Sequence, residues 1–248
     1  LVEVCRLLAA NRLVTVAAVG GSGKTRLAVA VGFEELSRRP DGVWFVDLTA
    51  VSNDEDVPGA AAVALGLQLT GGDPAAQLVA HLVDKQALLI LDNCEHVIDA
   101  AAGLCEALLA GGGKTVVLAT SREALDIDGE RVVQLGSLSG PVDDSSTASP
   151  AVELFVERAT AADPTFDPDA DGLSTISEVC VRLDGMPLAI ELAAARVTVM
   201  TPAQLLEGLD DRFRLLSGGR RRQRQRTLEA TLDWSYDLLE PADQRVFR

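Results

Sequence analysis

Lysine is scarce in this chain of 248 residues: three lysines stand against nineteen arginines. Long apolar runs are absent too, since none approaches the roughly 18–20 residues that span a bilayer. No secretory signal opens the chain. The net charge of −15 argues against a protein built mainly to coat nucleic acid. With a hydrophobic fraction of 48%, the chain has enough apolar side chains for a core, and we expect a cytoplasmic protein of one large or two modest domains.

Cysteine is also sparse, and its spacing excludes the common thiol motifs. Cys5, Cys94, Cys105 and Cys180 form no CxxC pair, so we expect small apolar residues in a reducing cytosol. His96 lies two residues after Cys94, but two ligands do not make a metal site. The chain opens on leucine inside a helical pattern and stops without a clear end, so we expect a fragment of a longer protein.

Residues 1–138 predict an α/β domain. Five short β-rich runs alternate with helical patterns, at Leu13–Ala17, Val43–Asp47, Ala87–Leu91, Thr115–Ala119 and Arg131–Leu135. The runs lack apolar/polar alternation, which is typical of strands buried on both faces. Strands that alternate with helices predict right-handed crossovers and a five-stranded parallel sheet.

The rest of the chain predicts helices only. Residues 139–150 are rich in serine and proline and predict a linker. Apolar residues then recur at helical spacing over 151–205, where we expect a small helical domain. Helices are expected near 152–159, 173–183, 187–199, 202–209 and 226–239.

The most informative lysine lies in "VAAVGGSGKTRLA", between a predicted strand and a predicted helix. Glycines at 20, 21 and 23 allow backbone N–H groups to turn inward around phosphate oxygens. The helix N-terminus adds its positive dipole end. Lys24 would reach the β- and γ-phosphates, and the Thr25 hydroxyl would ligate Mg²⁺. The segment predicts a P-loop.

A plain glycine turn explains the glycines but not the Lys-Thr pair in this register. The strict pattern has glycine at position 18, where this chain has alanine, a small departure. The predicted nucleotide-binding residues of the loop are Gly20, Gly21, Ser22, Gly23, Lys24, Thr25 and Arg26.

A magnesium-bound nucleotide needs an acid as well. Asp92 ends the apolar run "ALLILD", at the carboxyl edge of the predicted sheet, where ligands bind in open α/β sheets. Alone it could cap the next helix; beside a P-loop we expect it to hold Mg²⁺ together with Thr25.

The position after Asp92 bears on hydrolysis. Many hydrolytic P-loop enzymes resemble one another in carrying a second, water-activating acid there, whereas this chain has Asn93. Glu95 could replace that acid, or it could be a first-turn helix acid that the dipole stabilises, which we favour. We therefore expect slow ATP hydrolysis. Arg122, after the fourth strand, could bond the γ-phosphate or be an exposed loop arginine.

Six ordered blocks carry a family resemblance: "VGGSGKTRLA", "LLILDNCEH", "LATSREAL", "RLDGMPLAIELAAARV", "LDDRFRLLSGG" and "TLDWSYDLL". They resemble the bacterial signal-transduction ATPases with numerous domains, the STAND class, which are similar to the NB-ARC group and occur in large actinobacterial transcriptional regulators. The resemblance implies a P-loop domain, a small helical domain and, over 206–248, the start of a truncated winged-helix domain. It also implies that Arg122 senses the terminal phosphate and that Pro187 packs on the adenine.

The resemblance implies a regulatory switch that binds ATP or ADP with Mg²⁺ and contacts other domains of a longer chain. Self-association on activation stays open. A P-loop ATPase or kinase with steady turnover is the alternative, but no acceptor pocket or base is recognisable. A direct DNA-binding fragment is the third class, because residues 212–226 hold seven arginines. This stretch lacks interleaved aromatics, and an interdomain loop is the favoured interpretation.

Overall fold

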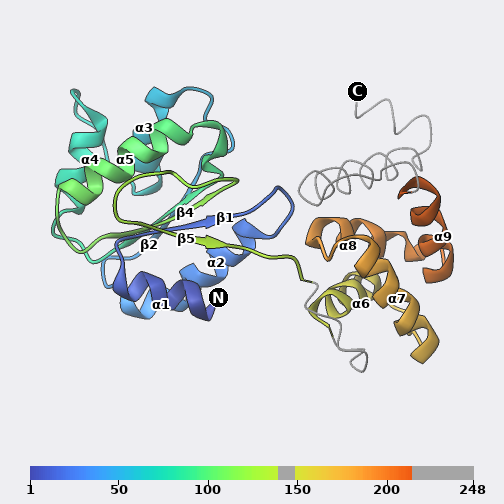
Figure 1. Ribbon diagram of the computed structural model, residues 1–248. Helices are drawn as coiled ribbons and strands as arrows, with labels where there is room; N and C mark the ends of the chain where they lie inside the picture. Colours follow the sequence, from blue (N-terminus) through green and yellow to red (C-terminus); the bar gives the residue numbers. More distant parts are fainter. Residues whose placement is uncertain (139–148, 214–248) are drawn as a thin grey trace. The chain divides into compact units, whose positions relative to one another are not determined.

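The computed structural model describes residues 1–138 and 149–213 (Figure 1). The chain divides into two compact units. The first unit comprises Leu1–Ala18 and Gly23–Leu135, and the second comprises Val19–Ser22 together with the chain from Gly136 onward. Residues 19–22 thus lie between two segments of the first unit in sequence while belonging to the second.

A five-stranded sheet forms the centre of the first unit, in the order β2-β3-β4-β1-β5 with every pair parallel. The predicted α/β class and parallel sheet are confirmed. Two strands have the predicted bounds, and three differ from them by one or two residues at their ends. The strands are β1 (Leu13–Ala17), β2 (Val43–Asp47), β3 (Leu88–Asp92), β4 (Val116–Ser121) and β5 (Glu130–Gln134).

The strands are buried according to their place in the sheet. Every residue of β1, β3 and β4 is buried, because helices cover both faces of the sheet there. Strands β2 and β5 lie at the edges and are partly exposed. Side chains of β3 alternate between the two faces: Leu89 and Leu91 join one apolar cluster, and Leu88 and Ile90 join the other.

Two layers of helices enclose this sheet (Figure 1). α1 (Val2–Ala10) and α2 (Lys24–Glu35) pack on one face, and α3 (Val57–Ala64), α4 (Pro74–Leu82) and α5 (Ile98–Ala110) pack on the other. Three short 3₁₀ helices complete the unit, η1 (Leu36–Arg38), η2 (Asp54–Asp56) and η3 (Cys94–His96). The last of these follows β3 after a single residue, Asn93, at the carboxyl edge of the sheet.

The described part of the second unit is helical. It contains α6 (Pro150–Ala162), α7 (Ala170–Arg182), α8 (Pro187–Ala194), η4 (Ala195–Thr198) and α9 (Pro202–Phe213), packed around the fully buried Phe155. The helix expected over 187–199 becomes 3₁₀ after Ala194, where β-branched Val197 and Thr198 lower the preference for α-helix. Within the described ranges, no helix is both long and apolar enough to cross a membrane.

Several features expected from the sequence lie wholly or partly outside the residues that the structure describes. Residues 139–148 of the expected linker lie outside the described ranges, whereas Ser149 caps α6 by accepting the Val152 N–H at 3.3 Å. Pro150 is the first residue of that helix. The arginine-rich stretch beyond residue 213, the helix expected at 226–239 and most of the expected winged-helix start also lie outside the described residues.

The turn that closes α5 offers a test of the packing. Gly112 and Gly113 both have positive φ, +72° and +83°. A Cβ on Gly112 would meet nothing within 4 Å, but one on Gly113 would lie 2.2 Å from the Val83 carbonyl oxygen. Gly112→Ala should cost about 1–2 kcal/mol of unfolding free energy for the left-handed backbone alone. Gly113→Ala should cost about 1–3 kcal/mol more, because the turn must shift.

Urea unfolding of the two variants beside the unsubstituted chain measures this difference. Equal losses for the two variants would show that the close approach of Gly113 to Val83 does not limit the fold.

Candidate functional site

The glycine-rich turn joins β1 to α2. Gly23 has φ of 89° and ψ of 18°, in the left-handed region, and serves as the N-cap of α2. Its carbonyl accepts the N–H of Leu27 at 3.0 Å, which starts the helix. Gly21 also has positive φ, at 73°. These two positions need glycine to turn the chain from the strand into the helix within so few residues.

Lys24 is buried at the start of this helix, with 8% of its surface exposed. Its Nζ donates to the carbonyl oxygen of Ala18 at 2.9 Å. Burial lowers the pKa of Lys24; Glu95 opposes that shift, Arg122 adds to it, and Asp92 opposes it. Because burial penalises the charged ammonium, a phosphate oxygen at this place would stabilise it.

A cluster of oxygens surrounds Asp92, the last residue of β3. The Thr25 hydroxyl donates to one carboxylate oxygen, Oδ2, at 2.8 Å. The Thr120 hydroxyl, at the end of β4, donates to the other, Oδ1, at 2.6 Å. Thr120 also accepts the N–H of Asn93 at 2.9 Å. Asp92 is 4% exposed. The ends of two neighbouring strands and one helix therefore meet on a single carboxylate.

The donors at this point fit magnesium. Thr25 and Asp92 bring a hydroxyl and a carboxylate within hydrogen-bond distance of each other, next to Lys24. Mg²⁺ prefers oxygen ligands and is commonly held by one or two carboxylates, with water and substrate phosphates completing its shell. No group of three or more His, Cys, Asp or Glu side chains gathers for a metal in the described ranges. The pair suits an ion that arrives with a nucleotide.

Cys94 and His96, two residues apart in the sequence, have separate hydrogen-bond partners. The Cys94 thiol is buried, and burial raises its pKa to about 12. It donates to the Leu91 carbonyl at 3.4 Å. His96 instead places Nε2 2.9 Å from the Val51 carbonyl and Nδ1 3.3 Å from the Asn93 side chain. Both residues stabilise the turn after β3.

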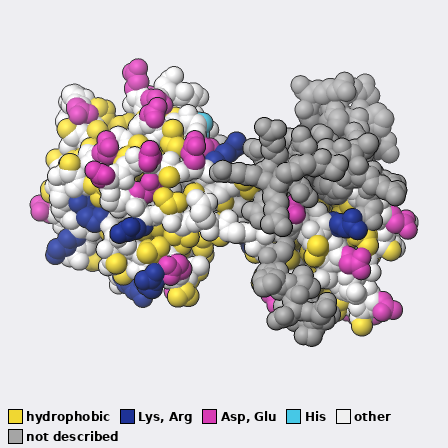
Figure 2. Space-filling model, in the orientation of Figure 1, with side chains coloured by type: hydrophobic (Ala, Val, Ile, Leu, Met, Phe, Trp, Pro, Cys, Tyr) yellow, Lys and Arg dark blue, Asp and Glu magenta, His cyan; other side chains and the backbone are white. Residues whose placement is uncertain are grey.

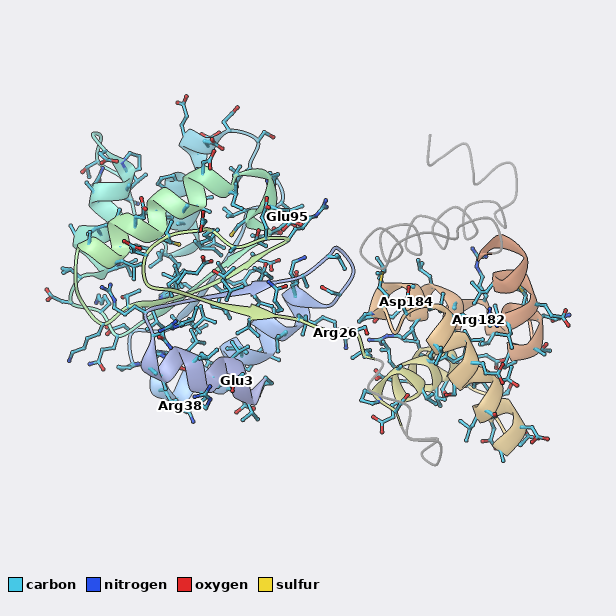
Figure 3. All side chains as sticks on the ribbon, in the orientation of Figure 1. Glu3, Arg26, Arg38, Glu95, Arg182 and Asp184 are labelled. Carbon is cyan, nitrogen blue, oxygen red and sulfur yellow. The ribbon has the colours of Figure 1, made fainter. Side chains whose placement is uncertain are left out.

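That turn places Glu95 beside Arg122. Asn93 has φ of 65°, so the chain reverses directly after Asp92 and then forms η3. The Nε of Arg122 donates to Oε1 of Glu95 at 3.0 Å. The Arg122 side chain is 61% exposed and that of Glu95 is 13% exposed. The second carboxylate oxygen of Glu95, Oε2, is buried without a hydrogen-bond partner. Glu95 lies at the end of the sheet where β1 and β4 finish (Figure 3).

The second unit contains Pro187 and the first part of the glycine loop. Pro187 opens α8 after a turn in which Asp184 and Gly185 both have positive φ. The next residue, Leu188, donates its N–H to the Gly21 carbonyl at 3.1 Å. The Ser22 hydroxyl donates to the Val19 carbonyl at 2.8 Å. The roles predicted for Pro187, for Arg26 on α2 and for the loop glycines in binding a nucleotide stay predictions.

No protein-family model matches the chain. It is 43% identical over 245 residues to the Mycobacterium tuberculosis protein named "Putative HTH-type transcriptional regulator Rv0890c", covering 98% of this chain and 27% of that protein. It is 41% identical over 247 residues to "Uncharacterized protein Rv0894" of the same organism, covering 98% and 61%. It is 31% identical over 251 residues to "Regulatory protein AfsR" of Streptomyces griseus, covering 94% and 23%. The chain thus spans only part of each relative.

A solved structure, Cdc6p from Pyrobaculum aerophilum, superposes with a TM-score of 0.51 at 14% identity, covering 80% of this chain and 57% of that one. At this identity the likeness concerns the fold. The sheet order, the glycine loop after β1 and the acid that ends β3 are those of a P-loop NTPase. The chain has a P-loop NTPase fold. Its expected fold class is therefore confirmed, including the helices that follow the sheet.

Two buried threonines of the first unit provide a matched test of the oxygen atoms around Asp92. Thr120 makes two hydrogen bonds around Asp92, whereas the Thr15 hydroxyl in β1 is buried without a partner. Thr120→Val should lower the affinity for Mg²⁺-ATP about tenfold, because bonds to charged groups contribute about 1.5–3 kcal/mol. Thr15→Val should leave affinity unchanged and stability equal or higher, because it removes an unpaired buried hydroxyl.

Calorimetric titration and thermal unfolding of both variants measure these effects. Equal affinity in the two variants would mean that the Thr120 hydroxyl does not support the magnesium ligand.

Proposed function

We propose that this chain is the ATP- and ADP-binding switch module of a longer transcriptional regulator, of the kind found in STAND ATPases. The observation that carries the proposal is the meeting of Lys24, Thr25 and Asp92 at the carboxyl edge of a parallel sheet. Lys24 supplies a buried positive charge for the β- and γ-phosphates, and Thr25 and Asp92 hold the accompanying Mg²⁺. Bound Mg²⁺ would neutralise phosphate charge there.

Arg122 distinguishes ATP from ADP in this proposal. Its guanidinium is largely exposed at the end of β4, so it can reach a terminal phosphate. Driving a two-state equilibrium from 1:99 to 99:1 takes about 5.5 kcal/mol of differential binding. Two or three charge-assisted bonds to the γ-phosphate, each worth about 1.5–3 kcal/mol, are of that size. Loss of the γ-phosphate would return Arg122 to Glu95.

The glycine loop provides the route from nucleotide to the second unit. Residues 19–22 belong to that unit, and the Gly21 carbonyl accepts the N–H of Leu188 directly after Pro187. A nucleotide that orders the loop would therefore also order the start of α8. With Pro187 on the adenine, as the family resemblance implies, ligand binding and the arrangement of the second unit become thermodynamically linked.

A regulatory role in transcription is supported by the names of two relatives, a putative HTH-type transcriptional regulator and the regulatory protein AfsR. We propose that contact with DNA belongs to another module of the longer protein. In the face that Figure 2 shows, basic side chains of the first unit lie mainly on the side of α1 and α2, with acidic ones over α3 to α5. The net charge of −15 disfavours binding of this chain to DNA phosphates.

Nucleotide binding is the first property to test. Mg²⁺-ATP and Mg²⁺-ADP should bind the 248-residue chain in a one-to-one ratio, and Lys24→Ala should weaken ATP binding at least tenfold, because it removes the buried charge that faces the phosphates. Calorimetry measures both, with Lys114→Ala as a control, since Lys114 lies in the exposed turn before β4. Equal ATP affinity for Lys24→Ala and the unsubstituted chain would overturn the proposal.

The second property to test is the contact of Pro187 with the nucleotide. Pro187 and Pro202 each occupy the first residue of a helix in the second unit, so replacing either by glycine perturbs a helix start in the same way. Pro187→Gly should weaken ADP affinity several-fold, whereas Pro202→Gly should leave it within twofold of the unsubstituted value. Circular dichroism checks that both variants remain helical. Similar ADP affinity for both variants would exclude a specific role of Pro187.

A further inference from the structure

Glu95 occupies an unusual environment at the P-loop edge. Its side chain is only 13% exposed, yet one carboxylate oxygen, Oε2, makes no hydrogen bond. Buried polar atoms in folded proteins are nearly always paired, because an unpaired one is destabilising, and more so when the group is charged. The arrangement therefore calls for an explanation beyond the filling of space after β3.

The partner of Glu95 does not provide that explanation. Arg122 bonds only Oε1, and its own side chain is 61% exposed. An ion pair with so exposed a partner contributes little to stability. This gain does not offset the burial of a charged oxygen that no group bonds. The ion pair with Arg122 therefore does not account for the burial of Oε2 without a partner.

Glu95 lies at the same edge of the parallel sheet as Lys24, the lysine of the predicted P-loop. Glu95 is the charge that raises the pKa of Lys24 most against the lowering effect of burial, and Arg122 has the opposite effect. Lys24, Glu95 and Arg122 follow the carboxyl ends of β1, β3 and β4, which lie next to one another in the parallel sheet in the order β3-β4-β1. A γ-phosphate bound by Lys24 would lie beside both members of the Glu95–Arg122 pair.

The residue that follows Asp92 cannot perform the proton transfer that hydrolysis requires. Asn93 has an amide side chain, which does not accept a proton at neutral pH. Its Nδ2 lies 3.3 Å from His96, and its left-handed backbone turns the chain so that Glu95, two residues later, faces Arg122. The chain therefore lacks an acid directly after β3, but it has one, Glu95, on the 3₁₀ helix η3 that follows.

We propose that Glu95 accepts the proton of the water that hydrolyses ATP, and that Arg122 restrains Glu95 until the γ-phosphate takes over the guanidinium. The water oxygen forms a bond to the γ-phosphorus, the bond from that phosphorus to the β–γ bridging oxygen breaks, and a water proton passes to Glu95. The products are ADP and inorganic phosphate. This inference rests on the proposed function, since it requires that ATP binds at Lys24.

The exchange of partners has a measurable consequence for binding. ATP must separate Arg122 from Glu95 before the guanidinium can bond the γ-phosphate, whereas ADP leaves the pair intact. Removing the charge of Glu95 should therefore favour ATP over ADP while it slows hydrolysis. A residue that merely supports the turn would lower binding and hydrolysis together.

Single-turnover hydrolysis and calorimetry on the full chain test this. Glu95→Gln should lower the hydrolysis rate at least tenfold and raise the ratio of ATP to ADP affinity about threefold or more. Glu95→Asp, which keeps the charge but withdraws the carboxylate, should hydrolyse at an intermediate rate. The matched control is Glu123→Gln, an exposed carboxylate next to Arg122, which should change both quantities less than twofold.

A double substitution isolates the role of Arg122. In an Arg122→Ala background the ATP preference should be lost, and adding Glu95→Gln should no longer raise it, because no guanidinium remains to be released. An affinity ratio that rises equally in both backgrounds would show that Glu95 does not act through Arg122 and would overturn the restraint.

Three results would overturn the assignment of Glu95 as base: hydrolysis by Glu95→Gln within threefold of the unsubstituted rate, a parallel fall of rate and ATP affinity in both Glu95 variants, or no hydrolysis by the unsubstituted chain over many hours. Each can occur while Mg²⁺-ATP still binds at Lys24. Failure of the unsubstituted chain to bind ATP would instead overturn the proposed function itself.

Discussion

The carboxylate of Asp92 is the point on which the site depends. It accepts the hydroxyls of Thr25 and Thr120 and so ties the end of β3 to the start of α2 and the end of β4. Strands β3 and β4 are positioned by burial on both faces of the sheet. Helix α2 is positioned by the left-handed turn at Gly23. A small displacement of any of these elements would separate the oxygens of Thr25 and Asp92, which we expect to bind Mg²⁺ together.

Charge around Lys24 follows from the same geometry. The ammonium is buried, so its charged state depends on neighbouring carboxylates, and the acid on η3 provides one that is itself held by Arg122. A γ-phosphate bound here would add negative charge beside two cations, Lys24 and Arg122, and two carboxylates, Glu95 and Asp92. The ion pair of Glu95 and Arg122 is then the least buried link, and it is the one we expect to open.

Much of the fold can be read from the sequence because parallel strands covered on both faces need uninterrupted apolar runs. Such runs stand out, and β1 and β2 have the predicted bounds. The end of α8 was harder, since Ala195 to Thr198 remain helical in pitch but tighten to 3₁₀. Helical spacing alone does not separate these two forms over one turn.

The site was only partly predictable. Lys24, Thr25 and Asp92 were predicted because the loop and the strand end each carry a recognisable pattern. The structure joins Thr25 to Asp92 by a hydrogen bond, and the roles of all three residues stay predictions. Thr120 was not among the predicted site residues, because a threonine at the end of a strand is common and only its hydrogen bond to Asp92 distinguishes it. Glu95 was considered as the water-activating acid but interpreted as a first-turn helix acid, because its unpaired oxygen is a property of packing that no sequence pattern reveals.

The central claim is that a nucleotide held at Lys24 acts on the helical second unit, and the amide of Leu188, which donates to Gly21, reports on it. Hydrogen exchange of the segment 185–192 should be followed with Mg²⁺-ATP, with Mg²⁺-ADP and without nucleotide, with Lys24→Ala as the control. We expect both nucleotides to slow exchange in this segment of the unsubstituted chain, to different extents, and to have no effect in the variant. Slowed exchange confined to residues 23–27 and 88–96 would contradict the claim.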